Sequence, residues 1–170
     1  PTDDPDGILA SLLEGLTFGI GDAILGLNPV DDSVESVTKV LKRFEEVKQK
    51  YYQVNTDLTL EVANIAKNAK VRQFIFMSSM IVYSGCGTTH ITKDTKPKAE
   101  NFYGDSKLQA DLKLQEMNDD SFKVVVVRPP MIYGKGSKGN YPQLVKLATK
   151  LPVFPIVNNK RSMLHIDNLC

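Results

Sequence analysis

The sequence predicts an α/β fold in which helices cover a parallel β-sheet, and two observations lead to this prediction. Amphipathic helical segments alternate along the chain with short apolar segments, which is the pattern of a layered α/β domain. One apolar segment, KVVVV at 123–127, contains four consecutive valines. Such a run is typical of a strand with both faces covered, as in a parallel sheet with right-handed crossovers.

Each element follows from its own pattern. Residues 32–50 carry an apolar stripe at helical spacing, with Asp32 as the predicted N-cap and Glu35 three residues later as a capping box. Residues 48–52, KQKYY, are the predicted boundary between two parts of the chain. In chain order we expect a helix at 8–16, a strand at 21–28, helices at 32–50 and 56–69, a strand at 71–79, a helix from Tyr103 to about Met117, a strand at 123–130, a helix at 141–151 and a short strand at 153–157. We expect strand 21–28 to lie in the same sheet as 72–77 and 123–127.

Composition sets limits on the function. The 170 residues suffice for one domain with a core, and 21 basic against 20 acidic side chains give a net charge of +1. This balance gives no reason to expect nucleic acid or an anionic membrane as a partner. No apolar run approaches the roughly 20 residues that span a bilayer. Cys86 and Cys170 lack metal-ligand spacing, so we expect no metal site and reduced thiols in a cytoplasmic protein.

One group of residues has the composition of a catalytic site. Ser78 and Ser79 end a predicted strand, Tyr103 begins the next predicted helix, and Lys107 follows one turn later on the same face. Sites in parallel sheets lie beyond the carboxyl ends of the strands. A cation close to a phenol favours the phenolate and lowers its pKa from about 10. Tyr and Lys at this spacing also occur by chance on solvated helices, so both interpretations stay open on the spacing alone.

A longer set of ordered motifs resembles a known family. The segments NTDLTLEVANIAKNAKVRQFIFMSSMIVY, YGDSKLQAD, VVVVRPPMIYGKGSKGNYP and RSMLHIDN within residues 51–170 are similar to the NAD-dependent epimerase/dehydratase family of extended short-chain dehydrogenases/reductases. The resemblance implies a partial Rossmann-like sheet in three layers. It also implies a nucleotide-sugar substrate, and is compatible with a homodimer through the Tyr103 helix and its neighbour.

The same resemblance implies roles for single residues. Ser79, Tyr103 and Lys107 would be catalytic, with Lys107 lowering the pKa of Tyr103. Arg161 would meet the diphosphate of the nucleotide sugar. An acidic pair after Ser79, which the family's 4,6-dehydratases carry, is replaced by Met80 and Ile81, and this favours epimerase or reductase chemistry. The residues that would line the cofactor are Asn55, Ser78, Lys107, Arg128 and Pro129.

The first part of the chain resembles a different protein. Residues 5–50, and above all GDAILGLNPVDDSVESV, are similar to the large subunit of ethanolamine ammonia-lyase, a cobalamin enzyme built on a TIM barrel. We therefore expect a barrel-type βα segment at 1–50 and a partial NAD(P)-binding domain at 51–170. The glycine-rich pyrophosphate loop of the epimerase family and its NAD-selecting residue are absent, which leaves NAD and NADP as alternatives. The alternatives to an epimerase are an inert chimeric α/β module and a fragment of an ammonia-lyase.

Overall fold

The computed structural model describes residues 4, 6, 7, 9, 33–88, 90–137, 140–152 and 160–169. The predicted strands 21–28 and 153–157, and all but one residue of the predicted helix 8–16, lie outside this part. The described elements are helix α2 (Val34–Tyr52), π-helix η1 (Gln53–Asp57), helix α3 (Leu58–Asn68), strand β1 (Gln73–Met77), 3-10 helix η2 (Met80–Tyr83), helix α4 (Phe102–Glu116), strand β2 (Lys123–Val127), strand β3 (Met131–Tyr133), helix α5 (Asn140–Lys150), strand β4 (Met163–His165) and 3-10 helix η3 (Ile166–Asn168).

A long helix crosses the predicted boundary at 48–52. α2 continues into η1 and then into α3, and the residues at both junctions keep right-handed helical backbone angles. The two predicted helices are thus present as α2 and α3, but the π-helix between them joins them into one continuous run, which the sequence did not predict. The segment KQKYYQVNTD at 48–57 contains neither Gly nor Pro, so nothing in it interrupts a helix. We call residues 34–68 the long helix. Within the described residues, no helix combines the length and apolarity needed to cross a membrane.

Side-chain caps fix where the two principal helices begin. The Ser33 hydroxyl accepts from the backbone N–H of Ser36 at 3.2 Å and caps α2, so the cap lies one residue after the predicted Asp32. In α4, the Asn101 side-chain oxygen accepts from the N–H of Gly104 at 2.6 Å. Each bond satisfies a donor that the first helical turn leaves without an intrahelical partner. The bounds of α4 agree with the predicted helix from Tyr103 to about Met117.

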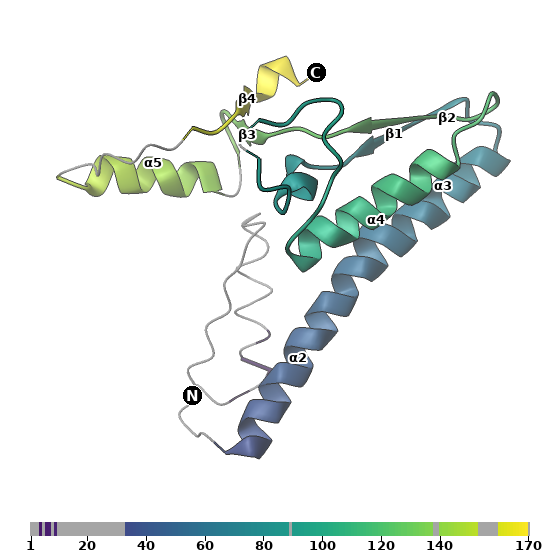
Figure 1. Ribbon diagram of the computed structural model, residues 1–170. Helices are drawn as coiled ribbons and strands as arrows, with labels where there is room; N and C mark the ends of the chain where they lie inside the picture. Colours follow the sequence, from purple (N-terminus) through teal and green to yellow (C-terminus); the bar gives the residue numbers. More distant parts are fainter. Residues whose placement is uncertain are drawn as a thin grey trace.

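The strands form two separate parallel pairs. β1 pairs with β2 in a register that places Gln73 opposite Lys123 and Met77 opposite Val127. This confirms that strands 72–77 and 123–127 are parallel neighbours. β3 pairs with β4, a pair that the sequence did not predict. Figure 1 shows β3 and β4 beyond the end of the β1–β2 pair, close to the C-terminus.

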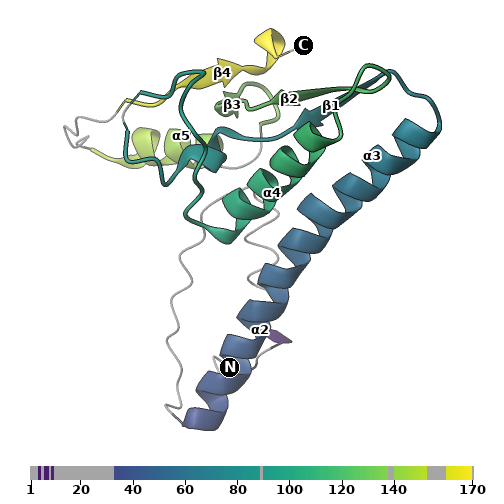
Figure 2. The same ribbon diagram turned by 45° about the vertical axis from the view of Figure 1, so that its right-hand side comes forward.

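The core lies between one face of β1–β2 and the two helices α3 and α4, which run side by side beneath the strands in Figures 1 and 2. Alternate strand residues point toward the helices, because side chains in a strand alternate between faces. Phe76 from β1 and the fully buried Phe122 belong to this core. Its buried members are Ala63, Phe76, Ala110, Leu114 and Phe122, with Phe74, Val124 and Val126 packed against them.

The other face of the β1–β2 pair is largely bare. Ile75 is 59% exposed, Met77 43% and Val125 37%. The expectation from KVVVV that both faces of this strand are covered is thus wrong for the described residues. The valine run does identify a parallel strand, but of the three predicted layers the described part of the chain supplies two, the strands and the helices on one face.

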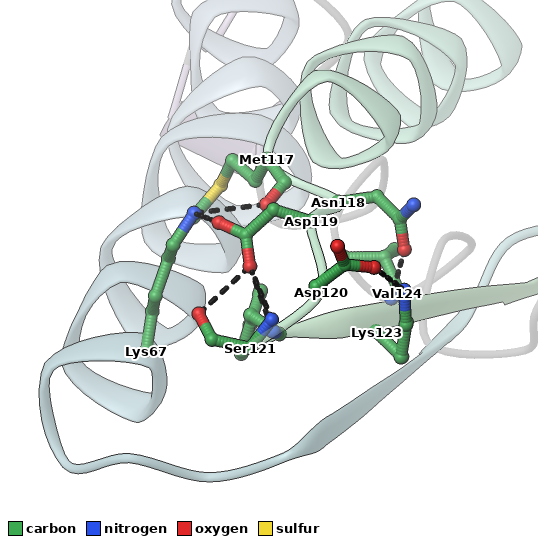
Figure 3. A network of polar contacts seen from close by, with 9 residues as sticks. Lys67, Met117, Asn118, Asp119, Asp120, Ser121, Lys123 and Val124 are labelled. Atoms are coloured by element: carbon green, nitrogen blue, oxygen red, sulfur yellow. Dashed lines mark hydrogen bonds and ion pairs between the residues drawn. The ribbon is translucent and has the colours of Figure 1, made fainter.

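A polar turn joins α4 to β2 and ties both to the end of α3 (Figure 3). The Asp119 carboxylate accepts from the N–H and the hydroxyl of Ser121, both at 2.8 Å, and from the N–H of Phe122 at 2.9 Å. Lys67 reaches across from α3 to form a 2.7 Å ion pair with Asp119 and donates to the carbonyl of Met117 at 3.0 Å. These bonds hold the pKa of Asp119 well below its usual range, with the Lys67 hydrogen bond as the largest cause.

Candidate functional site

The candidate site lies where β1 and β2 end. Backbone pairing continues past the strands, because the N–H of Ser78 donates to the carbonyl of Val127 at 2.8 Å and the N–H of Met80 donates to that of Pro129 at 3.1 Å. Ser79 therefore stands beside residues 128 and 129 at the carboxyl edge of the pair. This is the edge at which parallel sheets bind ligands.

Lys107 reaches this edge from α4. Its amine donates to the carbonyl oxygen of Met77, the last residue of β1, at 3.5 Å, and lies 5.2 Å from the centroid of the Phe76 ring. Burial lowers the pKa of Lys107, because a charged amine loses hydration there. The Lys107 amine thus contacts Met77, which lies two positions before Ser79 in the chain.

Tyr103 lies one turn before Lys107 in the first turn of α4, and its ring is half-buried. Its centroid is 5.8 Å from that of Tyr51, which comes from the long helix. Burial raises the pKa of Tyr103. This direction is opposite to the predicted one, because loss of water penalises the phenolate while the Lys107 amine is hydrogen-bonded to the Met77 carbonyl. The lowering of the Tyr103 pKa by Lys107 in a bound site stays a prediction.

Ser79 caps the short helix η2. Its hydroxyl oxygen accepts from the N–H of Ile81 at 3.2 Å, a bond that does not use the hydroxyl proton. The start of α4 packs closely on this segment, since a Cβ on Gly104 would lie 3.1 Å from the carbonyl oxygen of Ile81. The strand end with Ser79 and the first turn with Tyr103 are therefore adjacent. The meeting of their hydroxyls at a common point stays a prediction.

Two predicted cofactor residues are engaged elsewhere. The Ser78 hydroxyl donates to Asp111 at 3.2 Å, on the α4 side of the strands. Arg128 donates to both oxygens of Asp111 at 2.8 and 2.9 Å, and to the hydroxyl of Tyr83 at 2.6 Å. The contact of Ser78 and Arg128 with a cofactor stays a prediction, and three of the guanidinium N–H groups already have partners.

Asp111 is the residue that sequence reasoning missed. Asp111 is charged, yet its side chain is fully buried in α4, where its helix neighbours Ala110 and Leu114 are core residues. A carboxylate on the buried face of a helix requires a partner, because an unpaired charge is costly away from water. The position of Asp111 among apolar residues at helical spacing was the signal that could have found it.

Asn55 holds the long helix against α4. Its side-chain amide donates to the hydroxyl of Ser106 at 3.0 Å, and the Thr56 hydroxyl donates to the Ser106 carbonyl at 2.8 Å. Ser106 precedes Lys107, so Asn55 lies near the site. Its role in binding a cofactor stays a prediction.

Arg161 is exposed and lies two residues before β4, in the second strand pair. No contact that the structure describes joins it to Ser79, Tyr103 or Lys107. Among the described residues there is also no group of three or more His, Cys, Asp or Glu side chains that could hold a metal ion. The candidate site is therefore the edge with Ser79, Tyr103 and Lys107, supported by Asn55 and Asp111.

Comparison with known proteins places the first part of the chain. The family model of the ethanolamine ammonia lyase large subunit (EutB) matches residues 1–102 of the 170. The chain belongs to this family. The Escherichia coli (strain K12) ethanolamine ammonia-lyase large subunit is 47% identical over 49 residues, which are 29% of this chain and 11% of that protein. The family model extends past residue 50, and the boundary between residues 50 and 51 stays a prediction.

A second set of relatives matches more of the chain. A UDP-glucose 4-epimerase of Vibrio cholerae is 38% identical over 126 residues, covering 70% of this chain and 38% of that enzyme. Both resemblances seen in the sequence are therefore confirmed, and the chain joins an ammonia-lyase segment to an epimerase-like segment. It spans about two-fifths of the epimerase and about one-tenth of the ammonia-lyase subunit.

Solved structures show the fold of the epimerase-like segment. The UDP-N-acetylglucosamine 4-epimerase of Methanobrevibacter ruminantium M1, in complex with UDP-N-acetylmuramic acid, superposes with a TM-score of 0.58 at 19% identity, covering 69% of this chain and 41% of that one. The dTDP-glucose 4,6-dehydratase of Bacillus anthracis str. Ames, in complex with NAD, gives 0.55 at 25% identity, covering 68% and 40%. The fold is a partial Rossmann-type α/β fold.

Proposed function

We propose that the carboxyl edge of β1 and β2 is the nicotinamide end of a nucleotide-sugar epimerase site. The observation that carries this proposal is the Lys107 amine, 3.5 Å from the carbonyl at the end of β1, with Tyr103 one turn earlier on the same helix. The similarity to a UDP-glucose 4-epimerase and to structures solved with NAD or a nucleotide sugar supports it.

The residues at this edge suit one end of a dinucleotide. Lys107 would hold the ribose next to the nicotinamide, because its amine already lies at the strand end with donors to spare. Tyr103 would move a proton to or from the sugar hydroxyl. The hydroxyl of Ser79 would donate a hydrogen bond to the oxygen of that same sugar hydroxyl. NAD, when bound, supplies the hydride acceptor for such chemistry.

We further propose that this chain holds NAD only weakly and does not turn over. Most of the anchoring of a dinucleotide comes from its pyrophosphate at a helix N-terminus and from an acidic contact to the ribose. We expect that this chain lacks the family's glycine-rich turn after its first strand, because no segment of the sequence matches that motif. Loss of about 4 kcal/mol of binding free energy weakens affinity about a thousandfold.

Calorimetric titration with NAD tests both proposals, with Lys107→Ala compared against Lys113→Ala, an exposed lysine on the same helix. At micromolar NAD we expect no saturable binding by the wild type. At millimolar NAD we expect weak heats that Lys107→Ala removes and Lys113→Ala retains. Equal behaviour of the two variants would overturn the site, whereas tight micromolar binding lost in Lys107→Ala would overturn the weak-binding proposal.

An inert module is the second candidate, and one observation favours it. The Tyr51 ring packs on Tyr103, and burial keeps the pKa of the phenol raised. A neutral, partly covered phenol is a poor base at neutral pH. For the ammonia-lyase segment we propose no activity, since one βα unit can neither close a barrel nor enclose a cobalamin.

We also propose that the chain forms a homodimer through the long helix. Val54, Leu58, Val62 and Ile65 are exposed at spacings of four, four and three residues, and so form one apolar stripe on η1 and α3. A contiguous exposed apolar stripe is typical of an interaction surface. We call these four residues the α3 stripe.

A further inference from the structure

The Asp111 carboxylate is saturated by donors from α4 itself and from the residues that follow β1 and β2. Each of its oxygens accepts two hydrogen bonds, and the side chain is fully buried. The Oδ1 atom accepts from Gln115 Nε2 at 2.5 Å and from Arg128 Nη2 at 2.9 Å. The Oδ2 atom accepts from Arg128 Nε at 2.8 Å and from Ser78 Oγ at 3.2 Å. Two parallel bonds from a guanidinium constrain both distance and orientation.

These bonds connect Asp111 to the ends of both strands. Ser78 directly follows β1, and Arg128 directly follows β2. Lys107 lies one turn before Asp111 on α4 and donates to the carbonyl of Met77, the residue before Ser78. The helix is thus attached to the end of β1 at two successive turns, by Lys107 to Met77 and by Asp111 to Ser78.

We propose that Asp111 is a positioning residue, which fixes α4 lengthwise against the ends of β1 and β2 and thereby sets where Lys107 lies at the site. Asp111 acts through other side chains, because both oxygens of its buried carboxylate are engaged by Ser78, Gln115 and Arg128. The small residue Ala110 and the apolar residues Leu108 and Leu114 pack α4 on its neighbours, but apolar contacts are non-directional. The three directed bonds from Ser78 and Arg128 to Asp111 supply the register that packing leaves open.

Asp111→Asn removes the charge of this side chain but keeps its shape. The amide keeps the volume of the carboxylate but carries an NH₂ group in place of one oxygen. In either orientation this NH₂ faces an N–H of Arg128, because the guanidinium donates to both oxygens. The Arg128 charge also loses its buried counter-ion, which is destabilising. The double variant Asp111→Leu/Arg128→Met removes both charges together, and such replacements are often neutral for stability.

The position of Lys107 is measured by its pKa, from the NMR titration of lysine side-chain ¹³Cε signals with Lys107→Arg for assignment. Burial lowers this pKa in the wild type. We expect it to move up toward the ordinary lysine value in the folded double variant, because the amine leaves its place beside Met77 while the net charge of the Asp111–Arg128 pair is unchanged. Asp111→Asn alone also removes a negative charge near Lys107, which by itself lowers this pKa, so the double variant decides the result. Glu116→Gln, an exposed carboxylate on the same helix, should leave it unchanged.

The free energy of unfolding, measured with urea, shows whether Asp111 positions Lys107 or only stabilises the fold. A double variant with wild-type stability and a shifted Lys107 pKa is the expected result. A double variant that regains both stability and the wild-type Lys107 pKa would overturn the proposal. That this edge is an enzyme site rests on the proposed function, but the Lys107 titration needs no NAD. If the NAD titration contradicts the proposed function, the result of the Lys107 titration is unaffected.

Discussion

The hydroxyl of Tyr52 donates a 2.6 Å hydrogen bond to Oδ2 of Asp105, and so joins the long helix to the first turn of α4. Asn55 and Thr56 make two more bonds to α4 within the next turn of the long helix. Burial, and then the bond to Asp105, raise the pKa of Tyr52 to about 12. The phenol therefore stays neutral, and remains a donor, well above the pH at which a free tyrosine ionises.

This bond predicts a loss of stability at high pH. Because the folded-state pKa is above the ordinary value near 10, the stabilisation is complete below about pH 10 and disappears as the pH rises toward 12. Tyr52→Phe should lower the free energy of unfolding by roughly 1 kcal/mol at pH 8 and by less at pH 11. Urea unfolding at both pH values measures this. Tyr133→Phe, in the β3–β4 pair, should not change the pH dependence of the wild type, and an identical effect of both variants would contradict the prediction.

The position of the core predicts that two phenylalanines differ greatly in their contribution to the free energy of unfolding. Phe122 is fully buried, with its ring centroid 5.9 Å from that of Phe74. Phe122→Ala should lower the free energy of unfolding by about 3–5 kcal/mol, through lost burial and the cavity left behind. Phe102 begins α4 and is 55% exposed, so Phe102→Ala should cost under about 1 kcal/mol. Denaturant titration compares them, and similar costs would show that Phe122 is not in the core.

The turn after α4 predicts a response to acid. Since the pKa of Asp119 is depressed, its contribution to stability is present above about pH 4 and is lost as the pH falls through its folded-state value. Asp119→Asn should therefore be less stable than the wild type at pH 7, and the difference should shrink at pH 2. Asp120→Asn is the control, because Asp120 is fully exposed in the same turn. A constant difference across this range would contradict the prediction.

The α3 stripe predicts the oligomeric state. Sedimentation velocity at micromolar to millimolar concentration should show a dimer for the wild type and a monomer for Ile65→Lys, because a charge inside the contact would lose its hydration. Leu41→Lys is the matched control, since Leu41 on α2 is similarly exposed but lies outside the stripe. A monomeric wild type at all concentrations, or equal effects of the two variants, would refute the dimer.

Local patterns predicted the elements around the site well. The apolar run at 72–77 and the valine run at 123–127 both identified strands, and the parallel pairing of β1 with β2 followed from the intervening helix. The placement of Lys107 at the strand end followed from the same topology and from the spacing of α4. These features depend on neighbouring residues along the chain, which is why sequence reasoning reached them.

Other features depend on contacts that a sequence does not display. The boundary predicted at 48–52 does not interrupt the helix, because the backbone needs a Gly, a Pro or a competing cap to break a helix and this segment contains none. The bare face of β1–β2 was unpredictable from KVVVV, because a strand sequence does not say which layers are supplied. Asp111 was missed because its partners Ser78 and Arg128 are 33 and 17 residues away.

The length of the long helix also fixes how far its first residue lies from the candidate site. At 1.5 Å per residue, Val34 stands about 32 Å along the axis from Asn55, the residue that is fastened at the level of the strand ends. The hydrogen bonds from Tyr52, Asn55 and Thr56 to α4 hold the long helix at the level of the strand ends. The start of α2 is therefore carried this whole distance away from the candidate site.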